Sequence, residues 1–295
     1  MVLKVKELHP VFAAEARGLK VGPDLSPSVV EEIEDLMAKY AVLVLPDQKC
    51  TDEEQITFSR HFGPRESPLA AATGMPADRL QQYLFDASNL GTDHQILPEG
   101  HPRRQLRLGD RLWHSDSSFN PLPTKWSMLS GRIIPPEGGN TEFADARAAY
   151  DALPEAKKAM LDDLVAEHST WYSRLKGGMD GSLIGEKQHQ GMPPTLQPVI
   201  RMVPRSNRKT IYIGAHAGRI TGMSNEAGAA LIDELIEWCT QPQFVYSHKW
   251  TEGDLVIWDN RCTLHRARPF PDLEYKRDMR RTTVDEFHPA WARLG

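Results

Sequence analysis

The sequence has few cysteines, no long apolar run and no excess of positive charge. Its 3 cysteines, Cys50, Cys239 and Cys262, have no framework spacing, which excludes a disulfide scaffold and is typical of a reducing cytosol. No apolar stretch approaches the roughly 20 residues of a membrane span, and the charged residues within 1–10 are unlike a signal peptide. A formal net charge of -5 disfavours a nucleic-acid-binding surface. We therefore expect a cytoplasmic protein without a membrane or nucleic-acid partner.

Turn-forming residues are abundant, because the chain has 22 prolines and 21 glycines, which favour many turns over a helical bundle. Capping residues and apolar periodicity predict helices at 27–40, 52–62, 145–153, 154–165 and 225–239, and strands at 41–45, 126–134, 140–143, 199–203, 210–213, 244–250, 254–258, 264–267 and 275–284. Residues 192–198 are a predicted proline-rich connector, and 65–109 are predicted to be irregular and lid-like. We expect one domain, 1–295, built as a jelly-roll-like β-sandwich with decorating helices.

Two metal-capable side chains, His114 and Asp116, lie two residues apart in the stretch Leu112–Phe119. On an extended strand, side chains two residues apart point to the same face, whereas on a helix these two would point roughly 200° apart. We therefore expect a strand here, with an imidazole and a carboxylate on one face. These two groups would supply two of the three ligands of a facial iron site.

A third ligand must come from another part of the chain. His265 follows a predicted strand and a turn, and four other histidines compete with it on spacing alone: His168, His189, His216 and His248. A lone histidine is more often a packed or surface residue than a ligand. The spacing by itself leaves this choice open.

The predicted strand 275–284 carries arginines on its inward face. If Lys276, Asp278, Arg280 and Thr282 form the polar face toward solvent, then Arg277, Met279, Arg281 and Thr283 face inward. An unpaired buried charge costs several kcal/mol, so each inward arginine needs an anion. Either both form structural salt bridges, or they bind the carboxylates of small molecules in bidentate fashion. The second alternative suits a metal site with an anionic cosubstrate and an anionic substrate.

Several stretches in order resemble the iron(II)/2-oxoglutarate-dependent dioxygenases, in the branch of taurine dioxygenase and 2,4-dichlorophenoxyacetate dioxygenase. They are 112–119, the Gly-Gly-Asn-Thr-Glu-Phe turn at 138–143, 258–262 continuing to His265-Arg266, and 277–283, while 145–154 and 213–217 look closest to the phenoxyacetate enzyme. A bare His-x-Asp is a weak signal, whereas these stretches together are a strong one. The resemblance implies a mainly β protein with flanking helices around a double-stranded β-helix core, a jelly roll of cupin-like type.

The resemblance also implies roles for single residues. His114, Asp116 and His265 would bind Fe(II), and Thr141 and Arg277 would hold the two carboxylates of 2-oxoglutarate. Arg281 matches a position that meets the substrate anion, and His216 is a second candidate for substrate binding. Alternatives stay open for two of them. Thr141 could instead cap a local turn, and His216 could satisfy a backbone carbonyl.

The implied reaction couples decarboxylation of 2-oxoglutarate, with O2, to hydroxylation of a small anionic substrate. We expect an aryloxyacetate such as 2,4-dichlorophenoxyacetate, cleaved to a phenol and glyoxylate, as in aryloxyalkanoate degradation. The alternatives are taurine, another sulfonate or an alkyl sulfate, and more distantly a non-catalytic metal-binding sensor of cupin type. The sequence departs from the family at 66–108 and at Asp110, where relatives have an amide-bearing residue and an acid would be unfavourable beside an anion. Homo-oligomerisation stays open.

Overall fold

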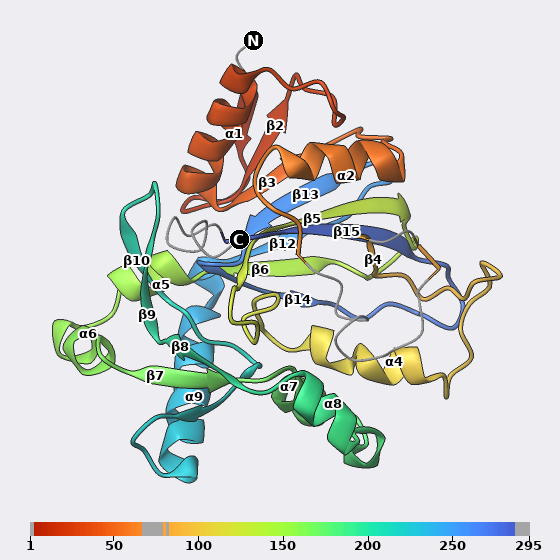
Figure 1. Cartoon of the computed structure of the whole chain (residues 1–295). Helices are drawn as coiled ribbons and strands as arrows, with labels where there is room; N and C mark the ends of the chain where they lie inside the picture. Colours follow the sequence, from red (N-terminus) through yellow and green to blue (C-terminus); the bar gives the residue numbers. More distant parts are fainter. Residues whose placement is uncertain (1–2, 67–78, 81–82, 287–295) are drawn as a thin grey trace.

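A seven-stranded sheet forms the base of the fold, within the described residues 3–66, 79–80 and 83–286 of this computed structural model (Figure 1). The strand order is β1-β2-β3-β13-β5-β15-β4. The bounds are β1 Lys4–Glu7, β2 Ala14–Arg17, β3 Val42–Leu45, β4 Phe85–Asp86, β5 Thr124–Ile133, β13 Leu255–Asp259 and β15 Asp278–Asp285. Neighbouring strands pair antiparallel except β2 and β3, which are parallel.

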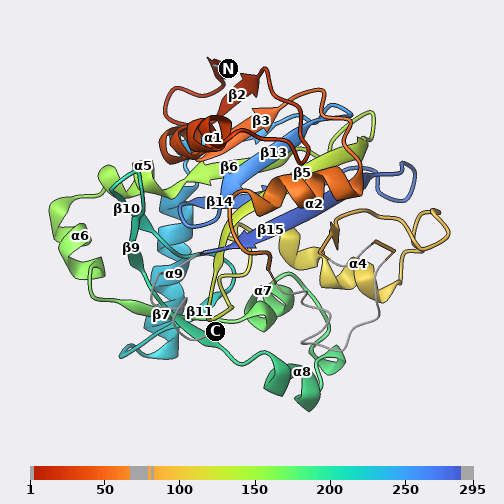
Figure 2. The same cartoon turned by 45° about the horizontal axis from the view of Figure 1, so that its top comes forward.

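Successive side chains of β3 point to opposite faces of this sheet and pack in two different hydrophobic cores. Leu43 and Leu45 pack on one face, in a core that includes residues of α1 (Pro27–Tyr40) and α2 (Asp52–Arg60). Val42 and Val44 pack on the other face, toward the interior of the sandwich. Both helices lie over the same face of the sheet (Figures 1 and 2). The continuous apolar run predicted as a strand is thus buried on both sides.

A three-stranded antiparallel sheet faces the interior side of the large sheet. Its order is β12-β6-β14, with β12 at Val245–His248, β6 at Thr141–Asp145 and β14 at Thr263–Ala267. Phe143 of β6 packs in the same core as Trp258 of β13 and Met279 of β15. The two facing sheets form the double-stranded β-helix, so the predicted fold class is confirmed.

The remaining helices and short strands lie outside these two sheets (Figure 1). They are α4 Pro102–Leu106, η1 Leu108–Arg111, α5 Ala146–Asp151, α6 Glu155–Leu161, β7 Val165–His168, α7 Thr170–Lys176, η2 Gly181–Leu183, α8 Glu186–Gly191, β8 Thr195–Pro198, β9 Ile200–Val203, β10 Arg208–Ile211, β11 Ala217–Ile220, α9 Asn225–Cys239 and η3 Pro242–Phe244. Leu231 and Leu235 of α9 pack with Leu264 of β14 in one core. In the described part of the chain, no helix has both the length and the apolar character to cross a membrane.

Local capping chemistry explains where the first two helices begin. The Ser26 hydroxyl accepts a hydrogen bond from the Val29 N–H, and Pro27 stands in the first turn of α1. Thr51 and Glu54 form a reciprocal capping box at the start of α2. Both helix starts were predicted from these residues, and both predictions are confirmed.

Two predicted segments differ from the structure. The helix predicted over 154–165 ends at Leu161, and β7 begins at Val165. The predicted connector 192–198 contains strand β8, which pairs with β7 in a sheet that also includes β11. Pairing with a distant strand makes both segments extended, and local composition does not reveal that partner. The lid-like segment 65–109 contains β4 and α4, and its residues 67–78 and 81–82 lie outside the described residues.

The outer face of β15 is covered, which corrects the prediction that it faces solvent. Asp278 is 4% exposed and Thr282 is 1% exposed. Arg79 Nη2 lies 2.7 Å from Asp278 Oδ1, and Arg280 Nη1 lies 2.6 Å from Asp52 at the start of α2. The polar alternation of the strand was read correctly. However, α2 and Arg79 cover this face and satisfy its charges with ion pairs.

Candidate active site

His114 lies in an isolated backbone bridge, Asp116 lies in the turn after it, and neither residue belongs to a strand. His114 pairs with His265 of β14 in an isolated antiparallel bridge, and Asp116 already belongs to a turn that contains Ser117 at φ +49°. The predicted strand at this stretch is therefore wrong. The chain is extended only at the bridge, and the turn that follows brings the Asp116 carboxylate toward the His114 ring.

Three predicted ligand side chains meet at this bridge. The ligand atoms of His114, Asp116 and His265 all lie within 4.8 Å of one another, and all three residues are buried. His114 Nε2 lies 4.0 Å from Asp116 Oδ1, and His265 Nε2 lies 3.7 Å from Asp116 Oδ2. His114 Nδ1 lies 2.8 Å from the Leu112 carbonyl, which can only accept, so Nδ1 carries the proton and Nε2 is free to bind a metal.

The Asp116 carboxylate is oriented by residues from three other segments. The Ser127 hydroxyl of β5 donates to Asp116 Oδ2 at 2.6 Å, and the Asn260 side chain accepts from the Asp116 backbone N–H at 3.0 Å. Arg281 of β15 donates to Asp116 Oδ1. Although burial raises the pKa of Asp116, the positive charge of Arg281 lowers it more, so its pKa lies well below its usual value. The carboxylate is therefore ionised, as a metal ligand must be.

The sequence reading did not single out Ser127 and Asn260. Ser127 is a fully buried polar residue on β5, and Asn260 is also fully buried, with its Nδ2 donating to the Ser127 hydroxyl at 2.9 Å. The sequence feature that could have identified Ser127 is a serine at an inward-facing position of a predicted strand. Such a residue needs a buried partner.

The competing histidines lie elsewhere. His168 bonds the Ser118 hydroxyl at 2.9 Å, and His248 Nε2 lies 3.2 Å from Asp254. His216 packs edge-on against His114 with ring centroids 5.6 Å apart, but none of its atoms belongs to the ligand group. The His189 side chain lies outside the described residues. Within the described residues, the structure therefore brings only His265 together with His114 and Asp116.

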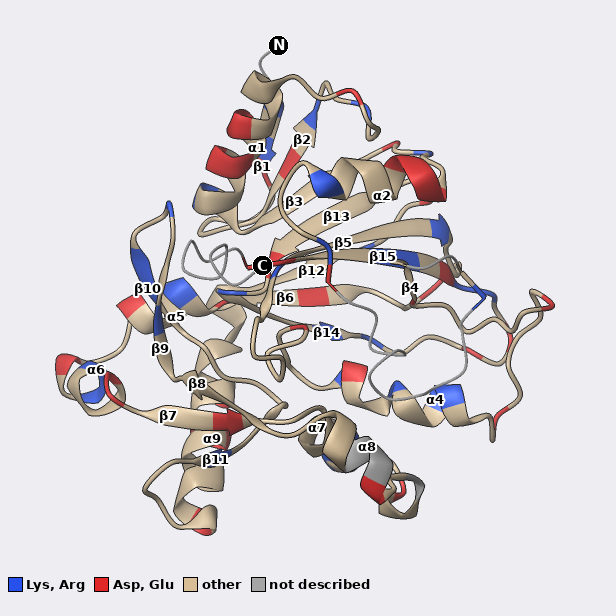
Figure 3. Ribbon diagram, in the orientation of Figure 1, with Lys and Arg blue, Asp and Glu red and all other residues tan. Residues whose placement is uncertain are grey.

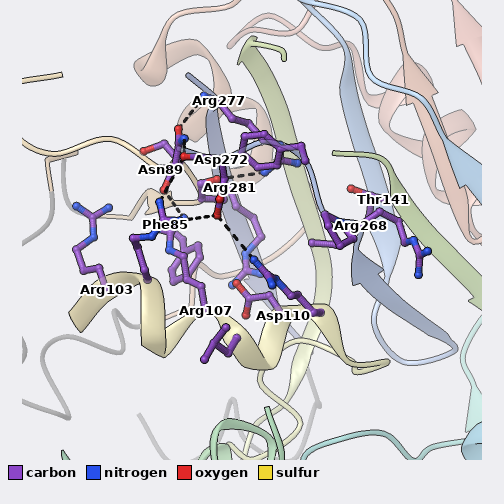
Figure 4. A pocket seen from close by; sticks show the side chains of 18 of the residues that line it. Phe85, Asn89, Arg103, Arg107, Asp110, Thr141, Arg268, Asp272, Arg277 and Arg281 are labelled. Atoms are coloured by element: carbon purple, nitrogen blue, oxygen red, sulfur yellow. Dashed lines mark hydrogen bonds and ion pairs between the residues drawn. The ribbon is translucent and has the colours of Figure 1, made fainter. Parts of the chain in front are cut away.

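A cavity of about 400 Å³ opens beside these three residues, and Figure 4 shows its side chains. His114, His265 and Thr141 line it. Its charged lining comprises Arg103, Arg104, Arg107, Arg111, Arg268, Arg277, Arg281, Glu99, Asp110 and Asp272. Two of these arginines, Arg103 and Arg104, come from α4, where basic residues are seen in Figure 3. Among the described lining residues, positive charges outnumber negative ones, so the cavity suits anions.

Thr141, the first residue of β6, and Arg277, which immediately precedes β15, both line this cavity. Thr141 follows the Gly138-Gly139 turn, where a Cβ on Gly138 would lie 2.6 Å from the Pro269 carbonyl, so only glycine fits. The Thr141 hydroxyl accepts a hydrogen bond from Trp250 Nε1 at 3.0 Å. The alternative of a local turn cap finds no support, because this partner lies on a distant segment. Thr141 and Arg268 lie on one side of the cavity in Figure 4.

Arg277 is a buried cation that contacts backbone carbonyls. Its guanidinium donates to the Ala87 and Gly139 carbonyls at 3.3 and 3.5 Å, while its Nε has no hydrogen-bond partner. In the described part of the chain, no acidic side chain forms an ion pair with it. Burial, and then the positive charge of Arg107, lower the pKa of Arg277 to about 10, so it stays charged near pH 7. The inward orientation predicted for Arg277 is confirmed.

Arg281 also faces inward, as predicted. It lines the cavity and pairs with Asp116, and its Cζ lies 4.5 Å from the ring centroid of Phe85 on β4. Phe85 pairs with Arg281 in the β4–β15 ladder, so the aromatic ring and the guanidinium are neighbours by register. Sequence reasoning did not find Phe85, because it belongs to the poorly patterned segment 65–109.

Two residues left open by the sequence are now placed. His216 is buried against His114 and Phe119 but does not line the cavity, and its Nδ1 has no hydrogen-bond partner. Asp110 of η1 does line the cavity; burial lowers the pKa of Arg277 and of Arg174, and the negative charge of Asp110 partly offsets this lowering. The acid at position 110 therefore lies among arginines, which compensate its charge.

Two imidazole nitrogens and one carboxylate, all buried and facing one point, are the donor set of non-haem iron oxygenases. Residues 4–283 match the family described as "Taurine catabolism dioxygenase TauD, TfdA family". The chain is similar to the alpha-ketoglutarate-dependent 2,4-dichlorophenoxyacetate dioxygenase of Cupriavidus pinatubonensis, with 41% identity over 97% of this chain and 99% of that protein. It is also similar to the (S)-phenoxypropionate/alpha-ketoglutarate-dioxygenase of Sphingobium herbicidovorans, with 37% identity over 93% and 92% of the two chains.

A solved structure resembles the whole fold. The crystal structure of AAD-2 in complex with Mn(II) and N-oxalylglycine superposes with a TM-score of 0.93 at 45% identity, covering 98% of this chain and 99% of that one. The match spans both sheets and the surrounding helices. The chain therefore belongs to the TauD/TfdA family and is a 2-oxoglutarate-dependent dioxygenase.

Proposed function

We propose that this enzyme hydroxylates an aryloxyacetate, using Fe(II), 2-oxoglutarate and O2. The observation that carries the proposal is the convergence of His114, Asp116 and His265 at the wall of an arginine-rich cavity. The similarity to dioxygenases named for 2,4-dichlorophenoxyacetate and phenoxypropionate supports this substrate class.

His114, Asp116 and His265 would hold Fe(II) through two imidazole nitrogens and one carboxylate. This donor set leaves adjacent coordination positions open for cosubstrate and oxygen, and bound Fe(II) supplies the oxidising chemistry. The proton on His114 Nδ1, bonded to the Leu112 carbonyl, keeps Nε2 directed at the metal. Ser127 and Arg281 keep the Asp116 carboxylate ionised and fixed. The surrounding hydrogen bonds thus hold the His114 ring and the Asp116 carboxylate in the orientation in which they would bind the metal.

Arg277 and Thr141 would bind 2-oxoglutarate, with Arg277 at the distal carboxylate. Arg277 is 9% exposed and lacks an acidic partner in the described chain, so a bound carboxylate would supply its counter-charge. Thr141 offers a hydroxyl that already accepts from Trp250, so its own proton is available to donate. N-oxalylglycine, an analogue of 2-oxoglutarate, occupies the similar AAD-2 structure.

Arg281 would orient the substrate, because it lines the cavity beside the proposed metal ligands and would bind the carboxylate of the substrate. The substrate-binding role predicted for His216 does not suit its position, because His216 packs against His114 and does not line the cavity. Hydroxylation of the carbon between the ether oxygen and the carboxylate gives a hemiacetal. It collapses to a phenol and glyoxylate, while 2-oxoglutarate and O2 yield succinate and CO2. Phe85 and Phe270 give the cavity apolar area that an aryl ring can contact.

The alternative keeps the same chemistry on a different anion. Taurine, another sulfonate or an alkyl sulfate would also pair with the arginines of this cavity. The two substrate classes differ in geometry, because a carboxylate is planar and a sulfonate is tetrahedral. We favour the aryloxyacetate because the cavity also carries aromatic side chains.

The deciding experiment measures succinate from 2-oxoglutarate with Fe(II) and each candidate substrate. We expect succinate formation coupled to phenol release with phenoxyacetates, and weak coupling with taurine or an alkyl sulfate. A strong preference for taurine would contradict the substrate class. Absence of succinate with every substrate would contradict the proposed enzyme and favour a metal-binding sensor.

We also propose a cytoplasmic location. Cys50, Cys239 and Cys262 are free and buried thiols. Free thiols are typical of reducing compartments. Fractionation of cells that express the protein tests this location directly, and recovery outside the cytoplasmic fraction would contradict it.

A further inference from the structure

Ser117 has a left-handed backbone conformation directly after the proposed metal ligand Asp116. Its φ is +49°, a value that a residue with a Cβ adopts only when its surroundings hold it there. The Asn120 N–H closes the turn by donating to the Ser117 carbonyl at 3.0 Å. Because this turn redirects the chain just after the His114 bridge, its conformation decides where the Asp116 carboxylate points.

Glu66 binds both ends of this turn. Its Oε1 accepts hydrogen bonds from the Ser117 hydroxyl and from Asn120 Nδ2, the latter at 3.1 Å. Its Oε2 accepts from the hydroxyl of Thr124, the first residue of β5, at 3.3 Å. One carboxylate therefore contacts the left-handed residue, the residue that closes the turn and the strand that follows.

The backbone of Glu66 is itself bonded to β15. Its N–H donates to the Thr283 carbonyl at 3.2 Å. The same strand supplies Arg281, which bonds the Asp116 carboxylate. Strand β15 therefore supports the proposed ligand in two ways, directly through Arg281 and, through Glu66, at the residue that follows it.

Another strand holds the rest of the turn. Gln197 of β8 donates from its Nε2 to the Ser118 and Asn120 carbonyls, at 3.2 Å in each case. These bonds fix the later residues of the turn, whereas the hydroxyl of the left-handed residue Ser117 bonds Glu66. The contact that supports the unfavourable φ therefore comes from Glu66.

We propose that Glu66 is a positioning residue of the metal centre, which holds Ser117 in its left-handed conformation and thereby orients the Asp116 carboxylate. The inference rests on the proposed function, because it requires Asp116 to be a metal ligand. Residues that orient metal ligands commonly contribute roughly 10- to 100-fold to metal affinity. Loss of Glu66 should therefore weaken metal binding although no ligand is removed.

The test measures the Mn(II) affinity of the full chain, from the electron paramagnetic resonance signal of the free ion. Glu66→Ala and Ser117→Ala each break the contact and should weaken Mn(II) binding about tenfold. Ser117→Gly also removes the hydroxyl, but glycine adopts a positive φ without strain, so its affinity should stay within about threefold of wild type. For the same reason, Glu66→Ala/Ser117→Gly should recover most of the affinity that Glu66→Ala loses.

A purely structural role predicts a different pattern. Glu66→Ala would then lower the melting temperature of the metal-free protein and leave its Mn(II) affinity unchanged. Glu54→Ala is the matched control for the loss of a hydrogen-bonded glutamate, because Glu54 accepts from the Thr51 N–H in the capping box of α2. It should lower the melting temperature and leave the Mn(II) affinity close to wild type.

Three results would overturn the inference: wild-type affinity in Glu66→Ala, an equal loss of affinity in Glu54→Ala, or no recovery in the double variant. If Glu66→Ala does not fold, the two Ser117 variants decide the point, and equal affinities in Ser117→Ala and Ser117→Gly would overturn it. Failure of the wild-type protein to bind Mn(II) would instead contradict the proposed metal site, and the inference with it.

Discussion

His114 and His265 are bonded to each other through their backbones in both directions. The His114 N–H donates to the His265 carbonyl at 3.0 Å, and the His265 N–H donates to the His114 carbonyl at 2.8 Å. Their ring centroids lie 4.2 Å apart. A reciprocal pair of this kind fixes two side chains on one side of a ladder. The spacing of the two imidazoles therefore depends on the backbone and does not require a bound ion.

Removal of His265 should abolish tight Fe(II) binding. His265→Ala leaves one imidazole and one carboxylate, which is too small a set for a stable iron site. The measurement is the stoichiometry of iron bound after anaerobic loading and desalting. His61→Ala is the control, because His61 lies outside the metal group and bonds the Pro23 carbonyl. An unchanged iron content in His265→Ala would show that another residue is the third ligand.

Substitution of Arg277 should affect the binding of 2-oxoglutarate, whereas substitution of Arg280 should affect the stability of the protein. Arg277→Ala removes a charge-assisted contact worth about 3 kcal/mol, so the KM for 2-oxoglutarate should rise roughly 100-fold or more with little change in melting temperature. Arg280 lies on the other face of β15 and pairs with Asp52 and Asp278. Arg280→Ala should therefore lower the melting temperature while leaving that KM within about twofold. Full activity of Arg277→Ala would contradict the proposed cosubstrate site.

The hydrogen bond from Trp250 to Thr141 gives a third prediction. Thr141→Val removes the hydroxyl from the cavity and leaves the buried Trp250 N–H without its acceptor. We expect the KM for 2-oxoglutarate to rise about tenfold and the free energy of unfolding to fall by about 1–3 kcal/mol. Trp250→Phe removes the donor but keeps the hydroxyl, so only stability should change. Kinetics and denaturant titrations of both variants decide the point, and an unchanged KM in Thr141→Val would place the carboxylate elsewhere.

Asp285 should make stability depend on pH. Burial, and then the charge of Glu66, raise the pKa of Asp285 to about 7, and its Oδ1 has no hydrogen-bond partner. In the unfolded chain the pKa of an aspartate is about 3.9, so the folded state holds this proton more tightly. Protonated Asp285 therefore contributes to the free energy of unfolding. This contribution is fully present below about pH 4 and is lost as the pH rises through about 7.

Asp285→Asn should therefore raise the melting temperature at pH 8 and change it little at pH 4. The measurement is the difference in melting temperature between variant and wild type across this range. Asp24→Asn is the control for replacing an aspartate by asparagine, because Asp24 is exposed and its substitution should leave the melting temperature close to that of wild type. A difference for Asp285→Asn that is constant with pH would show that this carboxyl is ionised when buried.

The sequence by itself predicted most elements that depend on local chemistry. Ser26 and the Thr51–Glu54 box mark where helices begin, and the apolar run 41–45 gives a buried strand, because capping and side-chain alternation act over a few residues. The same alternation showed correctly that Arg277 and Arg281 face inward. The family resemblance rested on motifs in sequence order and was confirmed by the comparisons.

What the sequence could not decide depends on contacts between distant segments. Periodicity shows that Asp278 lies opposite Arg277, but not that α2 and Arg79 cover that face. Spacing did not distinguish His265 from the other histidines, because only the register of β14 against the His114 bridge brings it to Asp116. Only the tertiary structure shows that Arg107 and Asp110 line the cavity. The cavity is formed where several elements meet, so the sequence of one segment does not reveal which of its residues line it.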